Sequence, residues 1–279
     1  MLFSVIRDSS CDHHRVTLPT QYLNLPKTNE ISKASIYLFN RISNHNLQDL
    51  RRMGIKIVCD IDDYWHLGQD HYLYHHFKAK GMAERIINSL KMADVVLTTH
   101  SKLADKVKAY NKNVFVVPNA IAYDKGQFNI GKQPYTGKIG FVGGMSHYKD
   151  IQLVEGLKLP QQISIHNYMD HYKGLNICLA PLIKNEFNEH KSNLKVLEAG
   201  CGHGMVLASD LHPFRNPLDE PFVDYCKPSE WKEKIQYVMD NPNYAQDRGD
   251  RLAEHCREHY DLIKVNELRK DIFLELLRK

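Results

Sequence analysis

Residues 191–198 place basic and polar side chains just before an amphipathic stretch that ends in a carboxylate. Lys191, Ser192 and Asn193 come first, and Glu198 closes the segment. Ser and Asn favour a helix start, where unpaired backbone N–H groups and a partial positive charge attract anions. Glu198 would lie about 9 Å further along the helix. This separation suits a nucleoside diphosphate, with phosphates at the helix start and ribose hydroxyls at the carboxylate; an ordinary surface helix is the alternative.

A pair of glycines, Gly143 and Gly144, follows an apolar run at residues 138–142 and precedes a segment that contains Lys149. The run predicts a buried strand, and the glycines predict a turn in which the backbone can approach a ligand closely. A single glycine turn after a strand is a weak signal by itself.

Three carboxylates, Asp60, Asp62 and Asp63, stand at the end of an apolar run at residues 56–61, and His66 follows them. At the carboxyl end of a strand they would face the crevice where ligands of α/β proteins bind. They could hold acceptor hydroxyls, or Asp62 or Asp63 could act as a base, and we include His66 as a third catalytic candidate. A capped turn and a cation site are the alternatives.

The stretch from Ala180 to Asp210 resembles the donor-binding signature of the GT-B glycosyltransferases, in the family-four-like branch (glycosyl transferases group one). The resemblance implies that Glu198 holds the ribose of a sugar nucleotide and that the helix start holds the diphosphate. His190 occupies a position where many members have a glutamate that contacts the sugar, and we include it among the donor-site candidates. The positions that match the phosphate-facing turn are Lys191, Ser192, Asn193 and Leu194.

Residues 138–150 and 58–67 resemble two further parts of these enzymes. The first is the loop that opens the C-terminal domain and touches the donor phosphates. Lys149 matches a lysine of that loop, His147 matches a histidine of a related subset, and Gly144 follows Gly143 where an arginine is often found. The second is an acidic motif in the N-terminal domain of a subset. Because GT-B enzymes do not rely on a metal held by an Asp-x-Asp motif, the resemblance implies no metal site.

Alternating strand-like and helix-like stretches predict two domains with mostly parallel sheets and helices on both faces. The resemblance implies the GT-B arrangement, with two Rossmann-like domains, a donor cleft between them and a last helix that crosses back. We predict domains at residues 1–125 and 126–260, a linker within 120–136, and a returning helix at 261–279. Predicted strands are Leu2–Ile6, Ala34–Phe39, Lys56–Ile61, Val95–Thr99, Val114–Val117, Ile139–Val142, Ile163–His166, Ile177–Ala180, Val206–Ala208 and Phe222–Val223. Predicted helices are Pro19–Leu23, Asn46–Met53, Tyr72–Met92, Lys102–Tyr110, Ile151–Leu157, Met169–Gly174, Asn193–Cys201, Ser229–Met239, Tyr244–His259 and Asp261–Leu277.

Composition is that of an ordinary globular protein, with 279 residues, 43% apolar and 25% charged. No apolar run approaches the roughly 20 residues that span a membrane, so we expect no integral membrane segment. Six scattered cysteines suggest reduced thiols in a cytoplasmic protein. Residues 1–125 hold 17 Lys and Arg against 12 Asp and Glu, whereas residues 126–279 hold 20 against 21. The basic first half would attract an anionic acceptor or a membrane surface, unless it is simply a solvated face.

These observations predict a hexosyl- or pentosyltransferase that moves a sugar from a nucleoside diphosphate sugar, with a UDP-sugar as the default, to an acceptor hydroxyl. We expect no permanently bound cofactor. The acceptor could be a glycan or lipid-linked sugar, or a hydroxymethylated base such as 5-hydroxymethylcytosine in DNA, which would have to leave the base stack. The short chain is typical of a compact member of the family, of the kind that small viral genomes carry. A sugar-nucleotide epimerase on the same fold is a further alternative.

Overall fold

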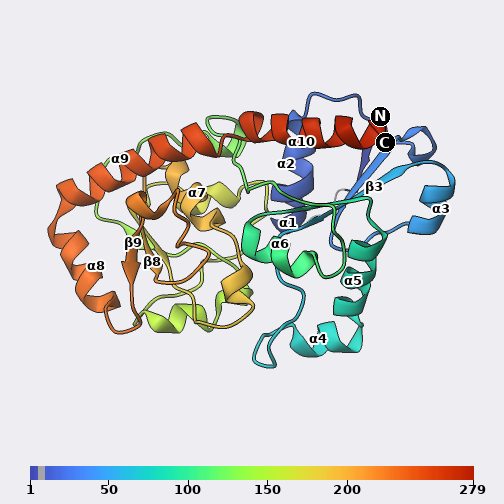
Figure 1. Cartoon of the computed structure of the whole chain (residues 1–279). Helices are drawn as coiled ribbons and strands as arrows, with labels where there is room; N and C mark the ends of the chain where they lie inside the picture. The colour runs from blue at the N-terminus through green and yellow to red at the C-terminus, as the bar shows by residue number, and fades with distance from the viewer. Residues whose placement is uncertain (6–9) are drawn as a thin grey trace. The chain divides into compact units, whose positions relative to one another are not determined.

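The computed structural model (Figure 1) describes residues 1–5 and 10–279 of the chain, which divide into two compact units. Unit 1 comprises Met1–Ala120 and Leu262–Lys279, and unit 2 comprises Ile121–Asp261. The chain therefore passes from one unit to the other twice. Ile121 and Asp261, which stand next to the two passages, form a parallel β-bridge.

Unit 1 is built on a parallel sheet with the strand order β1-β2-β3-β4-β5. Its strands are β1 (Leu2–Ser4), β2 (Ile36–Asn40), β3 (Lys56–Ile61), β4 (Val95–Thr98) and β5 (Val114–Val116). Its helices are α1 (Ser10–Asp12), the π-helical turn η1 (His13–Thr17), α2 (Leu18–Tyr22), the 3₁₀ turn η2 (Ile31–Lys33), α3 (Leu47–Arg52), α4 (Tyr74–Ala79), α5 (Met82–Met92), α6 (Ser101–Val107) and α10 (Leu262–Arg278).

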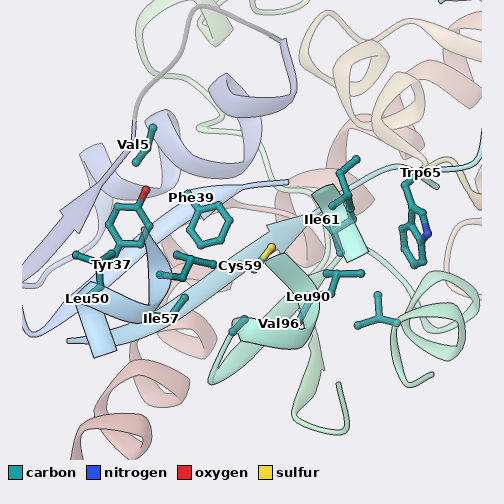
Figure 2. Close-up of a cluster of buried hydrophobic side chains, with 14 of the residues drawn as sticks. Val5, Tyr37, Phe39, Leu50, Ile57, Cys59, Ile61, Trp65, Leu90 and Val96 are labelled. Carbon is teal, nitrogen blue, oxygen red and sulfur yellow. The ribbon is translucent and has the colours of Figure 1, made fainter. Parts of the chain in front are cut away.

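The two faces of this sheet carry different layers, because side chains alternate along each strand. On one face, Tyr37, Phe39, Ile57, Cys59 and Ile61 pack with apolar side chains of α3, α5 and α6, as Figure 2 shows for part of this cluster. On the other face, η1 contacts β2, and α2 in turn contacts α10. The sheet is therefore covered on both sides, and β2 is buried along its whole length.

The last helix, α10, belongs to unit 1 although the segment before it belongs to unit 2. It buries Leu262, Val265, Ile272, Phe273 and Leu276, which recur at helical spacing. A side-chain hydrogen bond from Asn266 to the carbonyl of Pro19 joins α10 to α2. The returning helix of the predicted fold class is thus present.

Unit 2 is built on a second parallel sheet, with the order β6-β7-β8-β9. Its strands are β6 (Ile139–Gly140), β7 (Ile177–Ala180), β8 (Met205–Ser209) and β9 (Asp224–Cys226). Its helices are α7 (Leu194–Cys201), α8 (Trp231–Asp240) and α9 (Pro242–His259), with 3₁₀ turns η3 (Gly126–Phe128), η4 (Met145–His147), η5 (Asp150–Leu153), η6 (Tyr168–Tyr172), η7 (Asn188–His190) and η8 (Glu220–Phe222). Alternate residues of β7 and β8 pack with Trp231 and Val238 of α8.

Most predicted elements are present, and the exceptions have local causes. The predicted strand Ile163–His166 is wrong, because Ile163 is exposed among polar neighbours and the segment has no strand partner. The predicted helix Tyr72–Met92 is interrupted at Gly81, whose φ of 54° is left-handed. Ile151–Leu157 and Met169–Gly174 contain only 3₁₀ turns. The predicted strand Phe222–Val223 is wrong, because Phe222 ends the 3₁₀ turn η8 and the strand β9 begins at Asp224. Ile6, the last residue of the predicted strand Leu2–Ile6, lies outside the described residues. The helical segment Ser10–Thr17 was not predicted.

In the described part of the chain, none of the helices has the length and apolar character that crossing a lipid bilayer requires.

Helix α9 packs on the turn before β8 through a glycine. A Cβ added to Gly249 would lie 2.1 Å from the carbonyl oxygen of His203 and 3.1 Å from the amide nitrogen of Met205. Both atoms belong to backbone, which cannot rotate away as a side chain can. The close approach of α9 to this turn therefore requires glycine.

We predict that Gly249→Ala destabilises the protein by about 1–3 kcal/mol, because the new methyl group must push two backbone segments apart. In an unobstructed helix the same change would stabilise by up to about 1 kcal/mol, so the sign of the effect is diagnostic. Urea unfolding measures it, with Glu254→Ala at an exposed position of α9 as the control. A variant as stable as the wild type would contradict the packing described.

Candidate functional site

The glycine turn and the segment before α7 meet at the carboxyl edge of the second sheet. Strands β6 and β7 are parallel neighbours, paired at Gly140 and Cys178. The segments that leave their carboxyl ends, residues 141–150 and 181–193, therefore start side by side. In open parallel sheets this edge is where ligands bind.

Asp150 joins these two segments. Its Oδ1 accepts hydrogen bonds from the amide of Ile183 and from Nδ2 of Asn188, both at 2.9 Å. Nδ1 of His147 lies 2.9 Å from its Oδ2. Burial raises the pKa of Asp150, while the bond from Ile183 and the charge of Lys191 act in the opposite direction. The carboxylate thus fixes the 183–188 loop against the glycine turn.

A second buried carboxylate, Asp219, fixes the start of α7. One oxygen accepts from Nδ2 of Asn193 at 2.6 Å and Nδ2 of Asn216 at 3.2 Å. The other accepts from Nε2 of His255 at 2.9 Å and the hydroxyl of Tyr260 at 2.8 Å. Asn193 therefore directs its side chain inward to Asp219 and makes no side-chain cap bond to α7. The first amides of the helix lack intrahelical acceptors, as at any helix start.

Glu198 is buried on α7, with 1% of its surface exposed. Its Oε2 accepts hydrogen bonds from the hydroxyls of Tyr172 at 2.7 Å and Tyr168 at 3.2 Å. Burial raises the pKa of Glu198 to about 6, although Lys195 and the two tyrosines favour the charged form. A carboxylate that is desolvated and held in place is suited to accept hydrogen bonds from ligand hydroxyls.

Lys195 links α7 to the glycine turn. Its Nζ donates to the carbonyl of Val142 at 2.5 Å and lies 4.6 Å from the ring centroid of Phe141. A Cβ on Gly143 would come within 2.8 Å of this nitrogen and 2.5 Å of Phe141, so a larger residue would not fit beside them. Gly144 is exposed, and a Cβ there would meet nothing within 4 Å.

The other predicted donor residues lie in the same two segments but differ in exposure. His147 and His190 are buried, and Nδ1 of His190 is 2.7 Å from the carbonyl oxygen of Glu186. Lys149 is exposed. Lys191 is partly exposed, with its Nζ 4.8 Å from the centroid of the Phe187 ring. Ser192 and Leu194 are also partly exposed. Their roles in donor binding stay predictions.

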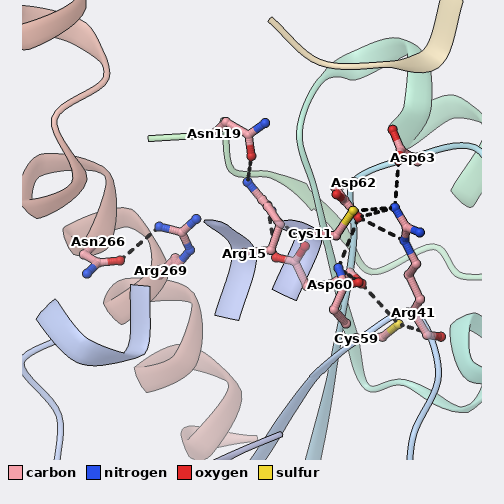
Figure 3. Close-up of polar contacts among 11 residues, drawn as sticks. Cys11, Arg15, Arg41, Cys59, Asp60, Asp62, Asp63, Asn119, Asn266 and Arg269 are labelled. Atoms are coloured by element: carbon pink, nitrogen blue, oxygen red, sulfur yellow. Dashed lines mark hydrogen bonds and ion pairs between the residues drawn. The ribbon is translucent and has the colours of Figure 1, made fainter. Parts of the chain in front are cut away.

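The acidic motif lies in unit 1, and its three carboxylates have different partners. Asp60 is fully buried and accepts hydrogen bonds from Nε and Nη2 of Arg15, at 2.8 and 3.0 Å. Burial raises the pKa of Asp60, against the effect of Arg15. Asn119 accepts a further bond from Arg15. Asp60 is therefore a structural anchor between β3 and η1 (Figure 3).

Asp62 and Asp63 share one guanidinium, that of Arg41, at 3.1 and 2.8 Å (Figure 3). Arg41 follows β2 with a φ of 58°, and its Nη2 also lies 2.9 Å from Sγ of Cys11. Burial acts to raise the pKa of Asp62, but the charges of Arg41 and Arg15 and the hydrogen bonds of Cys11 and Asn40 together outweigh it, and the net pKa is below the usual range. Sγ of Cys11 and the carboxylate oxygens of Asp62 and Asp63 lie within 4.8 Å of one another, close enough to hold a metal ion. In this structure Arg41 provides the positive charge there. The third catalytic candidate, His66, is exposed, and the centroid of its ring lies 5.3 Å from that of the Tyr64 ring.

The structure adds residues that the sequence analysis missed. Lys195 is three residues before Glu198, so helical spacing alone could have placed it on the same face. Arg41 follows β2, the strand next to β3. Because predicted neighbouring parallel strands end at the same edge of the sheet, its place near the acidic motif could have been predicted. Tyr168, Tyr172 and Asp219 are remote in sequence from their partners, and no local pattern marks them.

Solved structures of similar fold were found, although no protein-family model matches the sequence and no curated protein matches it. HepE from Anabaena, in complex with UDP, has a TM-score of 0.60 and 10% identity, over 98% of this chain and 92% of its own. The chain has the GT-B fold. An alpha-glucosyltransferase in complex with UDP-glucose and DNA containing an abasic site has a TM-score of 0.56 and 10% identity, over 100% and 90% of the two chains. TarM has a TM-score of 0.59 and 15% identity, over 90% of this chain and 56% of its own. This chain thus spans just over half the length of TarM.

We predict that Asp219→Asn destabilises the protein by about 2–3 kcal/mol. Each carboxylate oxygen accepts two hydrogen bonds, so either orientation of the amide turns an NH₂ group toward two donors and leaves buried groups unpaired. The control is Asp210→Asn, which weakens an exposed pair with Arg215 and should cost under about 1 kcal/mol. Equal effects of the two changes in urea unfolding would show that Asp219 does not organise the start of α7.

Proposed function

We propose that this protein is a glycosyltransferase that uses a nucleoside diphosphate sugar, with UDP as the nucleotide. The observation that carries the proposal is the buried Glu198, which lies on α7 beyond a helix start that Lys195 bonds to the carbonyl of Val142, just before the glycine turn. This arrangement offers a carboxylate for ribose hydroxyls and, at the helix start, backbone amides and lysines for phosphates. The GT-B fold, and the UDP or UDP-glucose in two of the similar structures, support it.

The chemistry requires stabilisation of the diphosphate that leaves when the glycosidic bond forms. Lys149, Lys191 and the amides at the start of α7 would supply positive charge where negative charge develops. The acceptor hydroxyl would be held by Asp62 or Asp63 in unit 1. The lowered pKa of Asp62 makes it a weak proton acceptor. This favours a reaction that retains the anomeric configuration and needs no protein base.

Two acceptor classes suit the chain. A glycan or lipid-linked sugar is the first, and the transferred group would be a hexose or a pentose. Hydroxymethylated DNA is the second, and the excess of basic residues in the first 125 positions favours it. On α6, Lys102 is partly exposed, and Nζ of Lys106 lies 5.3 Å from the centroid of the Tyr64 ring, next to the acidic motif.

We also propose a cytoplasmic setting, because all six cysteines are unpaired thiols.

We predict that Glu198→Gln weakens UDP binding by about 10- to 100-fold, because a neutral amide replaces the charged acceptor of the ribose hydroxyls. Isothermal titration with UDP measures the change, and GDP and ADP test the choice of base. The matched control is Glu155→Gln at an exposed position of the same unit, which should bind as the wild type does. Equal affinities for the two variants would place the nucleotide elsewhere and contradict the assignment of Glu198.

We predict that UDP-hexoses or UDP-pentoses release UDP faster in the presence of the true acceptor. Duplexes with and without 5-hydroxymethylcytosine distinguish the two classes, followed by mass analysis of the DNA. A sugar-mass gain confined to the modified duplex, with binding that weakens steeply as salt rises, would identify DNA as the acceptor. Release that no DNA stimulates would exclude it and direct the assay to glycan and lipid-linked acceptors.

A further inference from the structure

The ammonium of Lys195 lies between the glycine turn and Glu198. It belongs to the first turn of α7, while its Nζ reaches the carbonyl of Val142 immediately before Gly143. The missing Cβ of Gly143 leaves the space that Nζ occupies. Glu198, one helical turn further along, has an electrostatic effect on the same amine. The cation thus connects the helix start to the segment between β6 and the glycine turn.

This cation is incompletely compensated. Within residues 1–5 and 10–279 its hydrogen-bond acceptor is a neutral carbonyl, and its other near contact is the face of Phe141. The charged and titratable groups that act on it are Glu198 on its own helix, Lys191 before that helix, Asp150 after the glycine turn and Cys178 on β7. Burial lowers the pKa of Lys195 to about 8, even though Glu198 acts to raise it. A desolvated ammonium in this position gains most from an anionic partner.

We propose that Lys195 binds the diphosphate of the sugar nucleotide, exchanging the Val142 carbonyl for a phosphate oxygen when the donor enters. The inference rests on the proposed function and adds a phosphate-binding residue to it. A phosphate between the glycine turn and α7 would meet the ammonium, the first amides of the helix and the open side of Gly144. The bond to a charged oxygen is stronger than the bond to a neutral carbonyl, so the exchange favours the bound state.

The proposal has a consequence for pH. Only the protonated amine attracts the phosphate, and the amine of the free protein has a pKa of about 8. Affinity for UDP therefore falls as the pH rises through and beyond 8, because binding must then include uptake of a proton by Lys195. Arginine stays protonated throughout this range. Lys195→Arg should consequently flatten the alkaline decline while keeping a positive charge at the site.

The test compares UDP and uridine binding to the wild type, Lys195→Met and Lys195→Arg between pH 6.5 and 9.5. We expect Lys195→Met to weaken UDP binding by about 10-fold or more at pH 7, to leave uridine binding unchanged and to lose the alkaline decline. Lys158→Met, at an exposed position of unit 2, is the control and should behave as the wild type.

Three results would overturn the inference. If Lys195→Met binds UDP as tightly as the wild type, while Glu198→Gln does not, the donor site stands and Lys195 has no part in it. If UDP and uridine binding fall together, Lys195 supports the structure of the site rather than a phosphate. If the wild type binds neither UDP nor uridine, the proposed function fails, and this inference fails with it.

Discussion

Parallel strand pairing is the constraint on which both candidate sites depend. Neighbouring strands that run in the same direction deliver the segments after them to one edge of the sheet. In unit 1, Asn40 pairs with Asp60, so Arg41 and Asp62 leave the edge together. In unit 2, β6 and β7 deliver the glycine turn and the loop before α7 in the same way. Residues about 20 and 40 positions apart become neighbours by this rule alone.

Buried carboxylates then fix these segments, and they differ in the kind of partner that holds them. Asp60 has a bidentate arginine, and Asp219 has four hydrogen-bond donors. Glu198 has two tyrosine hydroxyls on one oxygen, and its pKa is raised to about 6. Because a buried charge is costly unless it is paired, the partners of Asp60 and Asp219 make these two carboxylates structural anchors. Glu198 differs in that its partners are two hydroxyls and the amine of Lys195 on its own helix.

The two basic side chains Arg41 and Lys195 also differ in the kind of partner that holds them. The guanidinium of Arg41 is satisfied by Asp62 and Asp63, whereas the ammonium of Lys195 rests on a carbonyl and an aromatic face. Arginine suits the first position because its planar fork can bond two carboxylates at once. Lysine suits the second because a single flexible amine can move from one acceptor to another. The acidic loop of unit 1 is accordingly held by ion pairs, while the start of α7 in unit 2 carries a cation whose hydrogen-bond acceptor is a neutral carbonyl.

The sequence by itself determined the α/β alternation, the bounds of β3 and β7, and the helix that carries Glu198, because periodic apolar residues and glycines act over a few neighbouring positions. It could not exclude a strand at Ile163–His166, since the same apolar residues can lie exposed when no strand is available to pair with them. For the candidate site, the sequence indicated residues that are close in the chain, as at Lys191–Glu198, and the resemblance added the glycine turn at Gly143. The partners of these residues, Tyr172 for Glu198, Asp219 for Asn193 and Arg41 for Asp62, were decided by the tertiary structure. The physical reason is that a buried polar group takes whichever donor the packing brings to it, and that donor can lie anywhere in the chain.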